Sequence, residues 1–201
     1  YLDSYKLVKL NAVIAIVACG ALVAGTCYLV SARALDLLGT DFTPFSRYVA
    51  PVSEELLKGL VIVLLTRAHR IGFLVDAAIF GFAVGTGFAL VENVYFLEIV
   101  QDAGIGTWIV RGFGTAIMHG GATAIFAVMA LAMLEQASDA GIRVRALLPG
   151  LGAAIVLHSA YNHLLTSPRV ATLTTLFAVP LLLHAVFQRS EKAVGEWLGQ
   201  G

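Results

Sequence analysis

Residues 10–30 read LNAVIAIVACGALVAGTCYLV, an almost unbroken apolar stretch. A helix needs about 20 consecutive apolar residues to cross the hydrocarbon core of a bilayer, so this stretch is long enough to span a membrane. The rest of the chain has the same character, because 59% of its 201 residues are hydrophobic and only 13% are charged. The composition therefore predicts an integral membrane protein and not a soluble domain.

Five further apolar stretches of similar length follow the first one. The six expected spans are 10–30, 44–66, 72–98, 108–134, 146–166 and 169–188. Residues 31–43 are expected to form an interfacial helix or a re-entrant turn. The sequence thus predicts an all-α, polytopic bundle of about six transmembrane helices that forms one integral membrane domain over residues 1–201. The net charge of zero gives no reason to expect a nucleic-acid partner.

Basic residues indicate how the bundle is oriented in the membrane. With the N-terminus inside, eight of them fall on the cytoplasmic side and four on the outer side. The inner group is Lys6, Lys9, Arg67, Arg70, Arg143, Arg145, Arg189 and Lys192, and the outer group is Arg33, Arg47, Arg111 and Arg169. This bias favours an arrangement with both termini inside the cell.

Two adjacent carboxylates, Glu54 and Glu55, interrupt the second span. An ionisable side chain at membrane depth is costly unless it serves a function, so the pair needs an explanation. One interpretation is that Ser53 caps a helix and the acids lie at its positive end. Such a helix would reach only about 21 Å before Arg67, short of the roughly 30 Å hydrocarbon core. A start at Thr43-Pro44 restores the length and puts both carboxylates inside the span, with Pro51 as a kink.

Further ionisable groups are expected at a similar depth on other helices. Glu92 lies near the outer end of the third span, His119 about 16 Å into the fourth, and His158 about two turns before the end of the fifth. Lys58 follows the two glutamates by one helical turn, so it can form an ion pair with one of them. Four helices would therefore present acids and imidazoles in the outer half of the membrane.

These motifs, in this order, resemble the PrsW family of intramembrane proteases. The resemblance covers about 50–165 and is carried by Glu54-Glu55-x-x-Lys58, by Phe88-Ala89-x-x-Glu92-Asn93, by the helix with His119, and by His158-x-x-x-Asn162. The family is related to the CAAX-processing and bacteriocin-processing proteases and to the scaffold subunit of gamma-secretase. The resemblance implies cleavage of a single-span membrane protein, such as an anti-sigma factor, near the extracytoplasmic side of the cell membrane.

Peptide hydrolysis at this site can be written in two ways. Glu54 or Glu55 serves as the base that takes a proton from water, and His158 and Asn162 donate hydrogen bonds to the developing oxyanion. In the metal-free version, a glutamate and a histidine activate the water directly. In the metal version, Glu92, His119 and His158 bind zinc and another glutamate is the base. Lys58, Asn93 and Thr123 are expected to support the site.

Two other classes of function use the same residues. Acids and histidines inside a bundle also form proton or cation paths in transporters, and a non-catalytic scaffold could bind transmembrane helices. Transporters commonly show two related halves with broken helices in matching positions, which this sequence lacks. The sequence therefore favours the protease, and it also suggests that residues 31–43 form a gate for the substrate.

Overall fold

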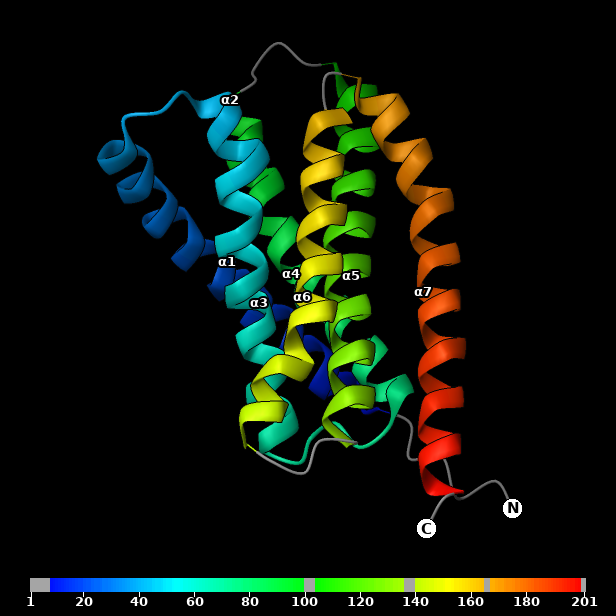
Figure 1. The fold of residues 1–201 in the computed structure, drawn as a ribbon. Coiled ribbons are helices and arrows are strands. Elements are labelled where there is room, and N and C mark those ends of the chain that lie inside the picture. The colour runs from blue at the N-terminus through cyan, green and yellow to red at the C-terminus, as the bar shows by residue number, and fades with distance from the viewer. Residues whose placement is uncertain (1–7, 100–103, 136–139, 165–166, 200–201) are drawn as a thin grey trace.

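The computed structural model describes residues 8–99, 104–135, 140–164 and 167–199, and these ranges contain helices and no strand. The helices in chain order are α1 (Leu10–Leu38), α2 (Phe42–Pro44), the π-helix η1 (Phe45–Val49), α3 (Ala50–Arg67), α4 (Leu74–Ile99), α5 (Ile105–Glu135), α6 (Ala140–Leu164) and α7 (Pro168–Leu198). Figure 1 shows α3 to α7 running roughly along one direction, whereas α1 crosses them obliquely. The predicted all-helical bundle is confirmed.

Within the residues that the structure describes, five helices, α1, α4, α5, α6 and α7, are long and apolar enough to cross a membrane. The expected second span differs from them, because α3 has only 18 residues and includes Glu54, Glu55, Lys58 and Arg67. It is preceded without a break by α2 and η1, so the chain stays helical from residue 42 to residue 67. The span predicted at 44–66 is thus built from three joined helical segments.

The interfacial helix or re-entrant turn expected at 31–43 is not found. Residues 31–38 instead continue α1, since no helix breaker occurs before Gly39. Gly39 takes up the left-handed conformation, with φ of 56°, and its N–H bonds to the carbonyl of Leu35. This is the usual way in which a helix ends, because glycine has no Cβ to clash in that conformation.

Glycines allow α4 to lie very close to its neighbours. A Cβ on Gly81 would collide with the α5 backbone at Thr123 and Ala124, and one on Gly85 would collide with the His119 carbonyl. Small residues at a helix interface permit this close approach. The contact fixes the height of His119 on α5 relative to the acid Glu92 on α4.

The close contact at Gly85 predicts that Gly85→Ala destabilises the protein by about 1–3 kcal/mol, because the added methyl group must push α5 away. Thermal unfolding in detergent micelles measures the change. Gly152→Ala in α6 is the matched control, since a Cβ there meets nothing within 4 Å. That variant should be neutral or slightly more stable, because alanine favours a helix interior. Equal loss of stability in both variants would contradict the packing argument.

Candidate active site

A buried chain of polar contacts joins α3, α5 and α6. Lys58 Nζ lies 2.5 Å from Glu55 Oε1 and 2.7 Å from His119 Nδ1. The same Glu55 oxygen lies 2.8 Å from His158 Nδ1. All four side chains are at most 2% exposed. The predicted ion pair between Lys58 and a glutamate therefore forms with Glu55, and it also binds both histidines.

These contacts decide which histidine nitrogens carry hydrogen. A carboxylate only accepts hydrogen bonds, so His158 donates from Nδ1 to Glu55 and, as a neutral ring, keeps a lone pair on Nε2. The Lys58 ammonium only donates, so His119 accepts at Nδ1 and carries its hydrogen on Nε2. That Nε2–H points to Glu92 Oε2, 2.5 Å away. Nε2 of His158 can therefore accept a hydrogen bond or bind a metal. It cannot donate the hydrogen bond to an oxyanion that was expected from the sequence.

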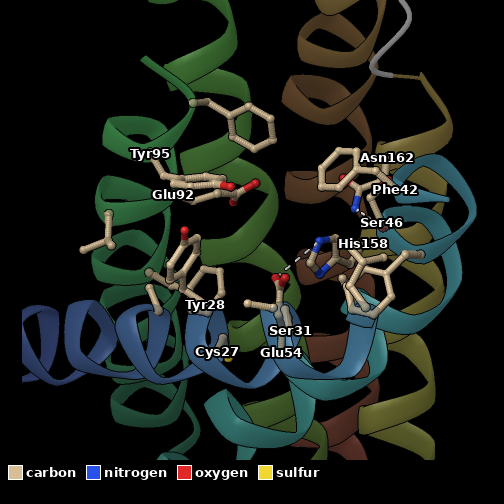
Figure 2. Close-up of a pocket in the computed structure, with 18 of the residues that line it drawn as sticks. Cys27, Tyr28, Ser31, Phe42, Ser46, Glu54, Glu92, Tyr95, His158 and Asn162 are labelled. Carbon is tan, nitrogen blue, oxygen red and sulfur yellow. Dashed lines mark hydrogen bonds and ion pairs between the residues drawn. The ribbon is translucent and has the colours of Figure 1, made fainter. Parts of the chain in front are cut away.

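Glu54 lies at the edge of this chain of contacts, where it points toward His158 and lines a cavity (Figure 2). Its Oε2 atom is buried and has no hydrogen-bond partner among the residues that the structure describes. The same atom lies 3.8 Å from Nε2 of His158, too far for a direct hydrogen bond. The two glutamates are adjacent in the sequence but have different surroundings, because Glu55 Oε1 has two partners and Glu54 Oε2 has no hydrogen-bond partner among the described residues.

The helix-cap interpretation of Ser53 is wrong. Its hydroxyl donates to the carbonyl of Ala50 at 3.0 Å, one turn back in a helix that has already begun. Helical structure starts at Phe42, with Asp41 in the N-cap position, two residues earlier than expected from Thr43 as N-cap and Pro44 as first helical residue. Both glutamates are therefore inside the helical segment, as the span-length argument predicted.

The π-helix η1 attaches the start of α3 to α6. The Ala50 N–H bonds to the carbonyl of Phe45, five residues back, which leaves the Ser46 carbonyl without its usual helical partner. Pro51 has no N–H to offer to the carbonyl of Arg47. Side chains of α6 donate hydrogen bonds to both carbonyls. These two interactions were not predicted from the sequence. Asn162 Nδ2 donates to Ser46 O at 2.8 Å, and Ser159 Oγ donates to Arg47 O at 2.6 Å.

These two donors follow His158 in α6 within about one turn, so they hold this part of α6 against the segment that leads to Glu54. Asn162 was expected to donate a hydrogen bond to an oxyanion. One of its side-chain N–H groups instead donates to a backbone carbonyl of η1. Thr123 donates to the His119 carbonyl at 2.9 Å, and Asn93 donates to the carbonyl of Gly112 at 3.4 Å. Both supporting residues thus contact the backbone of α5, which carries His119.

A cavity of about 770 Å³ opens onto Glu54, Glu92 and His158. One wall comes from α1 and another from α4, where Tyr28 and Tyr95 pack with ring centroids 4.7 Å apart. The segment 42–50 and Asn162 complete the lining. Sequence patterns did not single out the tyrosines, because aromatic residues in an apolar helix give no signal beyond packing.

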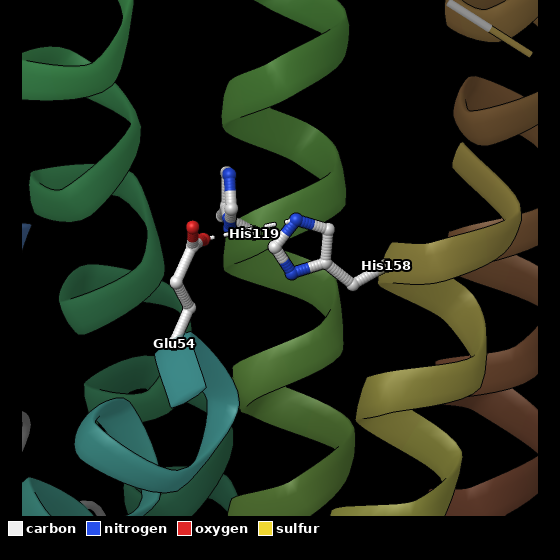
Figure 3. A group of neighbouring side chains, drawn as sticks. All are labelled: Glu54, His119 and His158. Atoms are coloured by element: carbon white, nitrogen blue, oxygen red, sulfur yellow. Dashed lines mark ion pairs between the residues drawn. The ribbon is translucent and has the colours of Figure 1, made fainter. Parts of the chain in front are cut away.

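Three side chains from three helices could hold a metal ion together. They are Glu54 of α3, His119 of α5 and His158 of α6, whose ligand atoms lie within 4.8 Å of one another (Figure 3). The sequence suggested Glu92 as the carboxylate of this group. The geometry favours Glu54 in that position and leaves Glu92 beside His119.

The sequence matches the family described as PrsW family intramembrane metalloprotease over residues 9–188. The chain belongs to this family. Neither the comparison with curated proteins nor the comparison with solved structures gives a match. Membership, together with five helices able to cross a membrane, identifies a multi-pass intramembrane peptidase. It favours the peptidase over the transporter and the non-catalytic scaffold.

For a PrsW-family protein, the donor set fits a metal ion of the zinc type. Two imidazoles and one carboxylate are the ligands of many catalytic zinc sites. Glu54 offers an unpartnered oxygen, and His158 offers a lone pair on Nε2 while its other nitrogen donates to the Glu55 carboxylate, as ligating histidines commonly do. To bind a metal through Nε2, His119 would have to give up the hydrogen that it now donates to Glu92. Metal binding would therefore release one proton from the hydrogen-bonded pair of Lys58 and His119.

Burial of the Lys58–Glu55 pair predicts a strong coupling between the two residues. Lys58→Met should lower the free energy of unfolding by about 3–5 kcal/mol, because it leaves a charged Glu55 in a dry interior. Glu55→Gln should be similarly costly, as it leaves Lys58 unbalanced. The double variant should lose less than the sum of the two, and chemical unfolding of all four proteins in detergent measures this. Additive losses would mean that the pair is not coupled.

Proposed function

We propose that this protein hydrolyses a peptide bond of a single-span membrane protein inside the cavity beside Glu54. The observation that carries the proposal is the buried Glu54 oxygen without a hydrogen-bond partner, which lies 3.8 Å from Nε2 of His158 in a side chain that lines the cavity. A buried polar atom without a partner is costly, so it points to a bound species. Water, substrate or a metal ion can each fill this position.

Glu54, His119 and His158 are the residues that would hold a zinc ion in this site. A bound zinc ion lowers the pKa of water and polarises the carbonyl that is attacked. Each of the three ligands comes from a different helix, so the site exists only when α3, α5 and α6 are packed together.

Glu92 is the base in this proposal. Its side chain is 23% exposed, lines the cavity and contacts His119 through one oxygen. The carboxylate takes a proton from the attacking water and then gives it to the nitrogen of the leaving amine, so the same group acts first as base and then as acid. Glu55 is a poorer choice, because Lys58 and His158 both contact its Oε1 atom.

The residues around these groups keep the site ready for reaction. Glu55 fixes the tautomer of His158, and Lys58 balances one negative charge in a setting where several carboxylates meet. Ser159 and Asn162 hold η1 against α6 and so keep Glu54 opposite His158. Such prior positioning lowers the barrier because little rearrangement is needed during the reaction.

A metal-free version uses the gap between Glu54 and His158 directly. Two polar atoms 3.8 Å apart are spaced so that one water can contact both. Glu54 would then take the proton of that water, and Glu92 would hold His119. The two versions differ in what Glu92 does and in whether metal is needed.

The position of the site and the family support a proposal for the substrate class. Charge bias in the sequence puts Glu54, Glu92 and His158 in the outer half of the membrane. A single-span protein such as an anti-sigma factor, cut near its extracytoplasmic side, is the substrate that we propose.

Loss of the Glu54 carboxylate should abolish cleavage. We expect Glu54→Gln and His158→Ala to reduce the rate at least about 100-fold, because each removes a group that contacts the reacting water. A single-span reporter reconstituted with the enzyme in liposomes reports cleavage on a gel. Asp76→Asn is the control acid, since Asp76 lies in the first turn of α4 and away from the cavity lining. Cleavage that survives both site changes would sink the protease mechanism.

Metal analysis of the purified protein should find about one zinc ion per chain. Glu54→Gln and His158→Ala remove ligands and should lower the metal content, whereas Glu92→Gln should keep the metal and still lose cleavage. Elemental analysis by mass spectrometry, after dialysis against trace zinc, gives the ratio without any activity assay. Full cleavage by a protein that holds no metal would refute the zinc version and leave the metal-free one.

A further inference from the structure

Arg111 lines the same cavity as Glu54 and His158, yet the mechanism above does not use it. The residue belongs to α5 and lies eight positions before His119, or about 12 Å along the helix axis. Its guanidinium carbon lies 3.7 Å from the centre of the Phe96 ring. This stacking orients the guanidinium plane, since a cation is attracted to the face of an aromatic ring.

Two guanidinium nitrogens of Arg111, Nε and Nη2, are buried and have no hydrogen-bond partner in the described part of the chain. These two N–H groups point in parallel from one edge of the guanidinium, and this edge matches the two oxygens of a carboxylate. Arginine keeps its charge in proteins, so it cannot avoid the cost of burial by losing a proton. An acceptor for this edge is therefore missing.

The described residues do not supply that acceptor. The ion pairs among them are those of Lys58, His119 and His158, and none includes Arg111 within 4.0 Å. Glu92 lines the same cavity and interacts electrostatically with Arg111, but its Oε2 contacts His119 and no ion pair within 4.0 Å joins Glu92 to Arg111. Within the described part of the chain this edge of the guanidinium therefore has no acceptor, and Arg111 lines the cavity in which a substrate would lie.

We propose that Arg111 binds a carboxylate of the substrate, and so selects substrates with an aspartate or glutamate near the scissile bond. This inference rests on the proposed function. The 12 Å between Arg111 and His119 along α5 corresponds to about three to four residues of an extended peptide. The acidic residue should therefore lie three to four positions from the cleaved bond, on its outer side.

A set of single-span reporters tests the inference. Each reporter carries one aspartate, or the matching asparagine, at successive positions outside the scissile bond. Wild-type enzyme should cleave the aspartate reporter about 10–100 times better in kcat/KM at the third or fourth position, the effect of a charged hydrogen-bonded pair. Arg111→Gln should remove this preference. Arg111→Glu should instead prefer a reporter with lysine at that position.

Controls separate this inference from its alternatives. Arg33→Gln, an exposed arginine of α1 outside the cavity lining, should keep the wild-type preference. Cleavage by the wild type without any preference for aspartate would overturn the role of Arg111 but leave the protease intact. No cleavage of any reporter would instead reject the proposed function.

The headgroup of an anionic lipid is the competing acceptor. If Arg111→Gln slowed both reporters equally, and only in liposomes that contain anionic lipid, the guanidinium would bind lipid and the proposal would be wrong. The same measurements in purely zwitterionic liposomes give the comparison.

Discussion

Lys58 is completely buried and touches both Glu55 of its own helix and His119 of α5. A lysine in this position cannot be solvated by water, so the packing of α3 against α5 and α6 must supply its partners. Glu55 in turn contacts His158, which links the third helix. The orientation of both imidazoles depends on this chain of contacts, and so does the direction in which Glu54 points. The other residues of the site are therefore positioned by the need to pair the buried ammonium group of Lys58.

The two adjacent glutamates illustrate how one helix serves structure and chemistry together. Neighbouring residues of a helix point in directions about 100° apart. Glu55 therefore faces the interior and is neutralised by Lys58, whereas Glu54 faces the cavity with an unpartnered oxygen. Pro51 and the π-helix before it leave two backbone carbonyls without helical partners. Ser159 and Asn162 of α6 donate hydrogen bonds to these carbonyls. The π-helix and Pro51 thus provide the two hydrogen bonds to α6 that keep Glu54 and His158 facing each other.

Much of the bundle could be predicted from the sequence, and so could the residues from which a candidate site is built. Apolar runs gave the long helices, and rare charges inside them marked Glu54, Glu55, Glu92, His119 and His158. Other features could not be predicted, because they depend on three-dimensional contacts. The extension of α1 to Leu38, the π-helix and the pairing of Asn162 with the Ser46 carbonyl have no signature in residue spacing. The choice between Glu54 and Glu92 as metal ligand likewise depends on distances between helices, which spacing along the chain does not give.

The central claim is that Glu54, His119 and His158 meet at one point to form the reactive centre. X-ray absorption spectroscopy at the zinc edge of the metal-loaded protein tests it most directly, because imidazole ligands give a distinct scattering pattern. The account predicts two imidazoles and oxygen ligands at about 2.0–2.2 Å, with one imidazole lost in His158→Ala. A spectrum that His158→Ala leaves unchanged would contradict the account.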